Sequence, residues 1–177
     1  MGQALKKYAA HYTVNDWELW QDRWELIDGI PYCMSPAPSI QHQFVNSRLI
    51  QVLNNSLTGC GKCIASIFID WQINEDTVVQ PDVPVICKGV MGNKLLVPPS
   101  IIFEILSPST KAKDKTVKFS LYESQKVKYY VLVDLEKKSL EFNKLQNRVY
   151  KKQKAGSSFL FELDECSFEF NFSEIWG

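Results

Sequence analysis

The apolar run Ile101-Ile-Phe-Glu-Ile-Leu106 constrains the fold of this chain more than any other segment. Pro98-Pro99 ends the loop before the run, and Pro108 breaks the chain after it. A short β-branched run of this kind is typical of a strand that is buried on both faces. We therefore expect a central strand here, which needs covering elements on each side of its sheet.

Periodicity and turn signals predict the elements around that strand. Asp28-Gly29 is a strong hairpin signal inside residues 24–34, because a two-residue turn needs positive φ. Apolar residues at helical spacing predict a long helix over residues 40–57, which Gly59 and Gly61 stop. The other expected elements are a short helix over 13–21, strands over 64–73, 78–86 and 128–133, a helix over 111–124, a meander over 140–150, an edge strand over 168–172 and a terminal turn over 173–176.

These elements and the composition define the expected fold class. Strands precede and follow two helices, so we expect an α/β (α+β) fold with a mixed central sheet flanked by helices. The predicted hairpin lies at its N-terminal end and the meander at its C-terminal end. Of the 177 residues 45% are hydrophobic and 23% are charged, which excludes a disordered chain and suits a single domain over residues 1–177.

The net charge and the length of the apolar stretches limit which kinds of partner we expect. Lys plus Arg number 20 and Asp plus Glu number 20, so the formal net charge is zero and gives no general attraction to nucleic acid. A polyanionic partner would therefore need locally clustered positive charge. No signal peptide is visible at the N-terminus, and the longest apolar stretches are too short to span a bilayer. We expect no membrane partner and a cytoplasmic location.

The five cysteines are expected to be reduced. An odd, scattered set without a secretory signal suggests free thiols in a cytosolic protein. Cys60-Gly-Lys-Cys63 matches half of a zinc site or a redox motif, but no second C-x-x-C supplies the other zinc ligands. A thioredoxin-like site would need the motif between a strand and a helix. We interpret this segment as a glycine-containing helix exit that carries two thiols.

Three acids stand out because each lies in an apolar or extended run: Glu25, Asp82 and Glu104. A carboxylate inside a strand covered on both faces is costly to ionise unless it is paired or binds a cation. The plain alternative for Glu104 is an acid at a strand end or sheet edge. On neighbouring strands, Asp82 and Glu104 could share a hard cation such as Mg²⁺. That ion would polarise a phosphodiester and lower the pKa of an attacking water.

An ordered set of short motifs makes a resemblance specific. The motifs are Glu25-Leu-Ile-Asp-Gly29, Met34-Ser-Pro36, His42, Pro81-Asp82-Val83, Pro99, Phe103-Glu-Ile-Leu-Ser-Pro-Ser-Thr110, Asp114 with Lys118 and Tyr122, and Val127-Lys-Tyr-Tyr-Val-Leu-Val-Asp134. In this order they resemble the Uma family of putative restriction endonucleases, a branch of the PD-(D/E)XK nuclease superfamily that is common in bacteria. Each motif alone is weak. The resemblance covers residues 12–150, which is most of the chain.

The resemblance implies a restriction-endonuclease-like core with a Mg²⁺ (or Mn²⁺) site at the open edge of its sheet. Asp82 matches the first acid of the superfamily motif and Glu104 matches the second. The carbonyl of Ile105 would be a further metal ligand. Glu25 matches the first-strand acid of the family and would be an accessory ligand. His42 could orient a carboxylate or contact substrate, although a lone helix histidine is more often a packing or surface residue.

One position departs from the superfamily motif. Its lysine is expected two residues after the second acid, where this chain has Leu106. In the family resembled, a lysine of the following helix is the usual substitute, and Lys118 matches that place. Lys111, Lys115, Lys118 and Tyr122 are spaced by four, three and four, which predicts one shared helix face. Lys118 could position or deprotonate the water or stabilise charge on the phosphate; the plain alternative is a solvated basic face.

The leading hypothesis is a metal-dependent DNA endonuclease that uses a Mg²⁺-activated water, with Asp82, Glu104 and Lys118 as catalytic residues. Six lysines between positions 111 and 128 would form a basic face that approaches the DNA backbone. A second hypothesis is a nuclease fold that binds nucleic acid or a protein partner without cutting. In a third, the acids serve stability alone.

The oligomeric state is left open, with a homodimer as one option. Several aromatic residues at expected sheet edges could line a dimer surface, but a place in the core is the simpler interpretation. These residues are Trp71, Phe168, Phe170 and Trp176.

Overall fold

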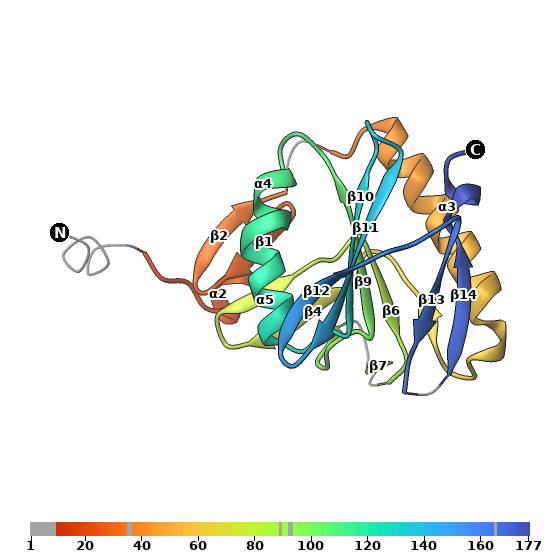
Figure 1. Cartoon of the computed structure of the whole chain (residues 1–177). Coiled ribbons are helices and arrows are strands. Elements are labelled where there is room, and N and C mark those ends of the chain that lie inside the picture. The colour runs from red at the N-terminus through yellow and green to blue at the C-terminus, as the bar shows by residue number, and fades with distance from the viewer. Residues whose placement is uncertain (1–9, 35–36, 89, 92–93, 165) are drawn as a thin grey trace.

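A six-stranded mixed sheet forms the centre of the molecule (Figure 1). The computed structural model describes residues 10–34, 37–88, 90–91, 94–164 and 166–177. The strands of the central sheet are β3 (Ile64–Ala65), β6 (Val83–Ile86), β9 (Ile101–Leu106), β10 (Tyr129–Asp134), β11 (Ser139–Gln146) and β12 (Val149–Gln153). They lie in the order β12-β11-β10-β9-β6-β3, with β9 and β10 parallel and the other pairs antiparallel.

The run that most constrained the fold forms β9 with the expected bounds. All six of its residues are buried, and its neighbours β6 and β10 pair with it on either side. The prediction of a strand covered on both faces is therefore confirmed. The mixed sheet confirms the expected fold class.

A second six-stranded sheet contains the N-terminal hairpin. Its strands are β1 (Trp24–Ile27), β2 (Ile30–Cys33), β4 (Asp70–Asn74), β5 (Thr77–Val79), β7 (Val90–Met91) and β8 (Lys94–Leu95), in the order β2-β1-β5-β4-β8-β7. Asp28 and Gly29 form the hairpin turn with φ values of 51° and 72°, as the turn signal predicts. A separate two-stranded sheet consists of β13 (Ser158–Glu162) and β14 (Ser167–Asn171).

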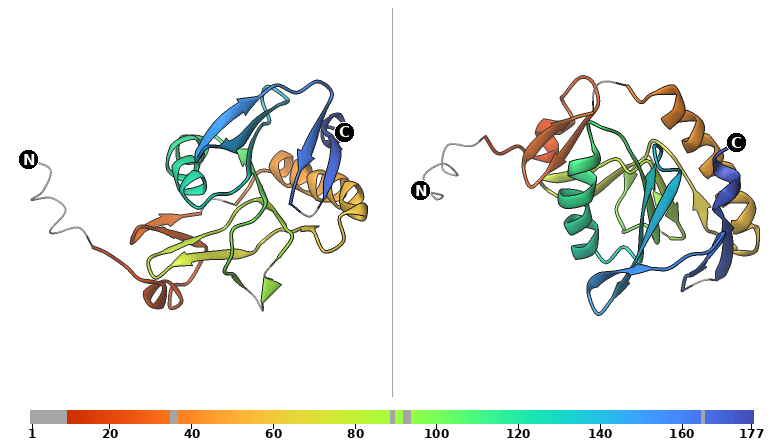
Figure 2. Two further views of the ribbon diagram at one scale, coloured as in Figure 1. Left: turned by 60° about the horizontal axis from the view of Figure 1, so that its bottom comes forward. Right: turned by 45° about the horizontal axis from the view of Figure 1, so that its top comes forward.

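Helices cover the central sheet from opposite sides (Figures 1 and 2). The helical elements are α2 (Val14–Trp17), α3 (Ile40–Ser56), η1 (Leu57–Gly59), α4 (Lys111–Lys113), the π-helical η2 (Asp114–Lys118), α5 (Phe119–Ser124) and η3 (Phe172–Ile175). On one face of β9, α3 and the β13–β14 hairpin form a single apolar core with Phe103. On the other face, Tyr122 of α5 and Trp71 of the second sheet pack with Ile102 and Leu106. Elements distant in sequence thus enclose both faces of one strand.

Several predicted boundaries were wrong. The first helix ends at Trp17 rather than near residue 21. The strand predicted over 64–73 divides into β3 and β4, and the one over 78–86 divides into β5 and β6. In each case the two halves join different sheets, because the chain crosses between layers within the apolar run. β13 was not predicted, and residues 35 and 36 of the Met34-Ser-Pro36 motif lie outside the described residues.

Four of the cysteines form disulfides, so the expectation of reduced thiols was wrong for them. Cys60 pairs with Cys166, and Cys63 pairs with Cys87. The pairing Ile64↔Ile86 of β3 and β6 brings Cys63 beside Cys87. Disulfides persist in oxidising compartments, so the cysteines give no support to a cytoplasmic location.

The aromatic residues considered for a dimer surface belong mainly to the interior. Trp71, Phe168 and Phe170 are 1%, 6% and 0% exposed, and Trp176 packs partly buried against the core. The simpler interpretation is confirmed for them. Among the described helices, none has the length and apolar character that crossing a bilayer would require.

Candidate functional site

Sheet register brings Asp82 and Glu104 together. Val83 pairs with Phe103 in the antiparallel ladder of β6 and β9, so the residues just outside this pair, Asp82 and Glu104, lie next to each other. Asp82 accepts a hydrogen bond at Oδ2 from the amide of Ile105 at 2.8 Å. Both carboxylates line one cavity of about 440 Å³. The structure therefore places the two acids at one site, on the same side of the sheet.

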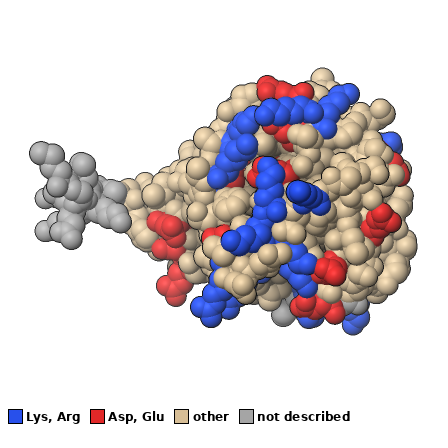
Figure 3. All heavy atoms as spheres, in the orientation of Figure 1, with Lys and Arg blue, Asp and Glu red and all other residues tan. Residues whose placement is uncertain are grey.

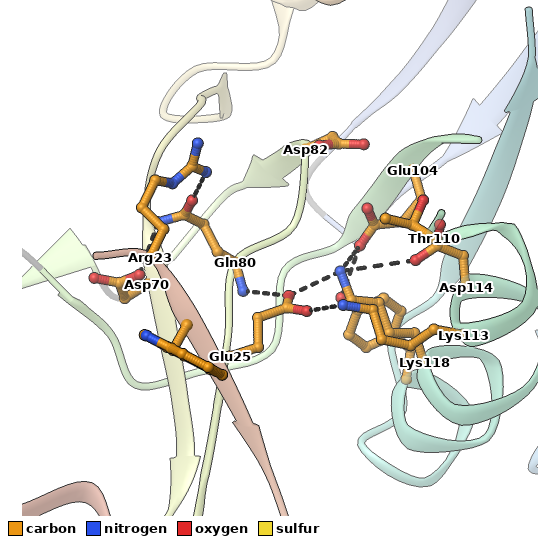
Figure 4. A network of polar contacts seen from close by, with 12 residues as sticks. Arg23, Glu25, Asp70, Gln80, Asp82, Glu104, Thr110, Lys113, Asp114 and Lys118 are labelled. Atoms are coloured by element: carbon orange, nitrogen blue, oxygen red, sulfur yellow. Dashed lines mark hydrogen bonds and ion pairs between the residues drawn. The ribbon is translucent and has the colours of Figure 1, made fainter. Parts of the chain in front are cut away.

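Lys118 lies at the centre of this site (Figure 4). Its Nζ is 2.8 Å from Oε1 of Glu25, 2.9 Å from Oε1 of Glu104 and 3.9 Å from Oδ1 of Asp114. The residue is 3% exposed, and it comes from the π-helical segment η2. The hydroxyl of Tyr122, one turn further along the helix, donates to Glu104 Oε1 at 2.9 Å. One buried ammonium group is thus shared by three carboxylates.

Glu25 is fully buried, and protein groups hold both of its oxygens. Oε1 accepts a hydrogen bond from the backbone N–H of Gln80 at 2.9 Å and also contacts Lys118. Oε2 pairs with Nζ of Lys113 at 2.6 Å. The side chain of Gln80 in turn contacts Arg23 and donates to Asp70 at 2.9 Å. Glu25 therefore holds Lys118 and Lys113 in place from the second sheet. It could bind a metal ion directly only if it gave up one of these partners.

His42, in the first turn of α3, contacts Asp82. Its Nε2 is 3.3 Å from Oδ2 of Asp82, the oxygen that also accepts the Ile105 amide. Ser39 caps α3 and accepts the backbone amide of His42, which fixes the start of this helix. Nδ1 of His42 is buried and has no hydrogen-bond partner among the described residues. The histidine thus orients one oxygen of Asp82.

Charge and burial shift the pKa values of these groups in opposite directions. Burial lowers the pKa of Lys118, but the carboxylates around it, Glu104 first, outweigh burial and hold that pKa well above its usual value. Burial raises the pKa of Glu104 well above its usual value despite the attraction of Lys118, and the other acids add to the rise. Burial also opposes ionisation of Asp82, but the hydrogen bond from His42 and nearby positive charge keep its pKa low. The raised pKa of Glu104 therefore reflects its burial first and the neighbouring carboxylates second.

The prediction that these four residues share one helix face was wrong for Lys115. Lys118 and Tyr122 are both buried at the site, whereas Lys115 is exposed. Asp114 takes its place, so the buried face runs Asp114, Lys118, Tyr122. At the start of α4, Nζ of Lys111 lies 3.3 Å from Oδ2 of Asp134. The π-helical turn contains more residues than an α-helical turn. Residues on its two sides therefore do not share the face that α-helical spacing predicts.

Sequence reasoning missed Lys113 as a partner of Glu25. Residues five apart in an α-helix are rotated by about 140° from each other, so Lys113 and Lys118 would not be expected to reach the same carboxylate. The π-helical segment lies between them and allows it. The role of Gln80 was also missed, because its contacts depend on the crossing of the chain between the sheets. Neither residue carried a local signal.

The predicted basic face is smaller than the lysine count suggested. Lysine and arginine side chains gather over the α4–α5 helix and the strands beside it, interspersed with acids (Figure 3). Lys113 and Lys118 turn inward to the carboxylates, and Lys111 and Lys128 pair with Asp134 and Asp164. Much of the positive charge of this segment is therefore already neutralised within the protein.

The donor set at Asp82 and Glu104 fits a hard divalent cation. Within the described part of the chain, Asp82 is contacted at Oδ2 and Glu104 at Oε1, so each acid has a second oxygen outside these contacts. Across all the residues that the structure describes, no group of three or more His, Cys, Asp or Glu side chains is arranged to hold a metal ion. Mg²⁺ commonly binds through one or two carboxylates and keeps several waters. Two carboxylates that line one cavity therefore satisfy its requirement.

Comparisons with known proteins agree with this architecture. A model of the family Uma2, described as putative restriction endonuclease, matches residues 13–169. The uncharacterized protein slr1290 of Synechocystis sp. is 35% identical over 111 residues, which cover 60% of this chain and 57% of that protein. The crystal structure of a putative nuclease belonging to DUF820 from Anabaena variabilis superposes with a TM-score of 0.72 at 17% identity, covering 93% of this chain and 97% of that one. The last match shows a shared fold.

Proposed function

Because the chain belongs to the Uma2 family of putative restriction endonucleases, we propose that it is a metal-dependent endonuclease that hydrolyses phosphodiester bonds in DNA. One observation carries this proposal. Asp82 and Glu104 line one cavity, each with an oxygen outside the internal hydrogen bonds, beside the buried ammonium of Lys118. Such a constellation is costly to maintain in a protein interior, and it is suited to binding a cation and a phosphate together.

Asp82 and Glu104, with the carbonyl of Ile105, would hold Mg²⁺ or Mn²⁺ at this site. When bound, the ion would polarise the phosphodiester and lower the pKa of an attacking water. The side chains around the acids prepare them for this role. His42 and the Ile105 amide fix Oδ2 of Asp82, and Tyr122 fixes Oε1 of Glu104.

Lys118 supplies fixed positive charge in the proposed mechanism. Its Nζ donates to carboxylates on two sides and lies in the cavity wall. A preorganised cation at this place would stabilise negative charge that develops on the phosphate. Glu25 holds the ammonium from the second sheet and acts as a positioning residue. Of the roles expected for Lys118, charge stabilisation suits this arrangement better than proton abstraction.

One observation favours a second candidate, a nuclease fold that binds nucleic acid without cutting it. Leu106 occupies the lysine position of the superfamily motif, and Lys118 already forms an ion pair with Glu104. In such a protein the ammonium would replace the metal ion instead of assisting it. The two candidates differ in whether Glu104 binds a divalent cation.

A plasmid-nicking assay tests the proposal. Wild type should convert supercoiled DNA into nicked and linear forms with Mg²⁺ or Mn²⁺. We expect Asp82→Asn and Glu104→Gln to slow this on the order of 100-fold or more, the scale of losing one preorganised electrostatic group. Asp164→Asn, whose side chain is 77% exposed and which pairs with Lys128, is the matched control and should cut like wild type.

Two outcomes would contradict the proposal. Cleavage by Asp82→Asn at the wild-type rate would remove the site from the reaction. Wild type that binds DNA but never cuts it, over a range of salt and divalent cations, would instead support the binding module.

A further inference from the structure

A second cavity adjoins the acid site and has a different character. It has a volume of about 480 Å³ and shares Arg23, His42 and Asp82 with the first cavity. Its walls come from the first turns of α3 and from the segment before β4, and they expose large apolar side chains. These are Ile40, Phe44, Ile67 and Phe68, which are 87%, 47%, 38% and 68% exposed.

Phe68 is held on this wall in an unusual conformation. Its φ of 54° lies in the left-handed region, which bulky residues seldom adopt. The guanidinium of Arg23 lies 5.4 Å from the centre of its ring. A large aromatic side chain kept exposed by a strained backbone gains little for folding, and such conflicts concentrate at functional sites.

Asn46 gives the cavity a polar feature. Its side chain is among those that line the cavity. The cavity therefore combines two aromatic rings, one amide side chain and an adjacent guanidinium.

We propose that this cavity binds an unpaired nucleobase of the DNA strand whose phosphate enters the acid site, an inference that rests on the proposed function. A base has a π-face for Phe44 and Phe68 and a polar edge for Asn46. Arg23 borders both cavities and can bridge to the connecting backbone. Because the chain carries no net charge and many lysines near the site are paired internally, stacking supplies binding energy that phosphate contacts do not. The preferred substrate is then single-stranded or locally unpaired DNA, since duplex bases are already stacked.

Fluorescence anisotropy of the full chain in EDTA tests this, because binding is then measured without cleavage. The probes are a labelled single strand, the same sequence as a duplex, and an abasic strand that keeps the phosphates. We expect the single strand to bind on the order of 10-fold tighter than the other two. Phe44→Ala and Phe68→Ala should each weaken single-strand binding by about 5- to 10-fold. Phe68→Tyr should retain it.

Leu160→Ala is the matched control, because Leu160 is 57% exposed on β13 and does not line the cavity. Equal binding of the abasic and normal strands would overturn the inference, as would Phe variants that bind like wild type. Sedimentation that shows a wild-type dimer and a monomeric Phe68→Ala variant would also overturn it, in favour of a protein interface. Base-dependent binding without nicking activity would contradict the proposed endonuclease alone. Nicking with base-independent binding would contradict this inference alone.

Discussion

Alternate side chains of β9 enter two very different environments. Ile101, Phe103 and Ile105 face an apolar core, where the ring of Phe103 lies 5.5 Å from that of Phe170. Ile102 and Leu106 face the other side, and Glu104 lies between them in contact with Lys118. Both sides are almost completely closed to solvent, so the contrast is one of chemistry and not of burial.

The two faces of β9 differ in what they contribute to stability. Apolar burial contributes about 25 cal/mol per Å², whereas a buried ion pair often does no better than the apolar side chains that could replace it. Stability alone therefore gives little reason to keep charges on the face with Glu104. We propose that these charges serve a ligand, and the following predictions test that division.

Lys118→Met should produce the largest effect. It leaves Glu25, Glu104 and Asp114 without their shared counter-charge, and breaking a buried ion pair from one side costs about 3–5 kcal/mol. Urea unfolding at neutral pH measures this loss. Lys152→Met, at a lysine whose side chain is 69% exposed and pairs with Glu141, should cost under about 1 kcal/mol. An equal cost for the two variants would show that the buried network is not a coupled unit.

Mg²⁺ should stabilise the wild type by an amount set by its affinity, about 2.7 kcal/mol at 100 times Kd. The reason is that the proposed ion site needs Asp82 and Glu104 side by side, and the unfolded chain does not hold them adjacent. Thermal unfolding in a Mg²⁺ titration measures the gain, and EDTA should reverse it. Glu104→Gln should remove it. A gain that survives in Glu104→Gln would place the ion elsewhere on the protein.

Phe103→Leu, on the opposite face of the same strand, should have the smallest effect. Loss of ring contacts with Phe161 and Phe170 should cost about 1–2 kcal/mol. Chemical unfolding measures the cost, and Mg²⁺ stabilisation should be unchanged at a temperature where the variant is folded. If Phe103→Leu weakened the Mg²⁺ effect as much as Glu104→Gln does, the two faces would not be independent.

Elements with strong local patterns could be predicted from the sequence. The apolar run of β9, the helical spacing in α3 and the Asp28-Gly29 turn all appear where expected. Their signals lie within a few residues, since burial on both faces, amphipathic spacing and positive φ are properties of short segments. The division of two predicted strands between separate sheets was missed, because the layer that a strand joins depends on long-range packing.

For the site, the sequence predicted which residues meet better than how they meet. The apolar strand context singled out Asp82 and Glu104, the family resemblance added Lys118, and the structure brings all three to one cavity. It gave no indication that Lys113 would reach Glu25, since that contact requires a π-helical turn. The Cys60–Cys166 disulfide was equally invisible, because its partners are 106 positions apart in sequence.

The π-helical segment holds one residue more than an ordinary α-helical turn would. Thr116 lies exposed within η2, so a substitution there leaves the register of the helix intact. Deleting Thr116 would change the spacing of Lys113 and Lys118 from five residues to four, which an ordinary α-helix places on one face. Functional relatives that lack this residue should therefore have a regular α-helix here and the same contacts to Glu25 and Glu104. A second deletion would rotate Lys118 by about 100° away from them.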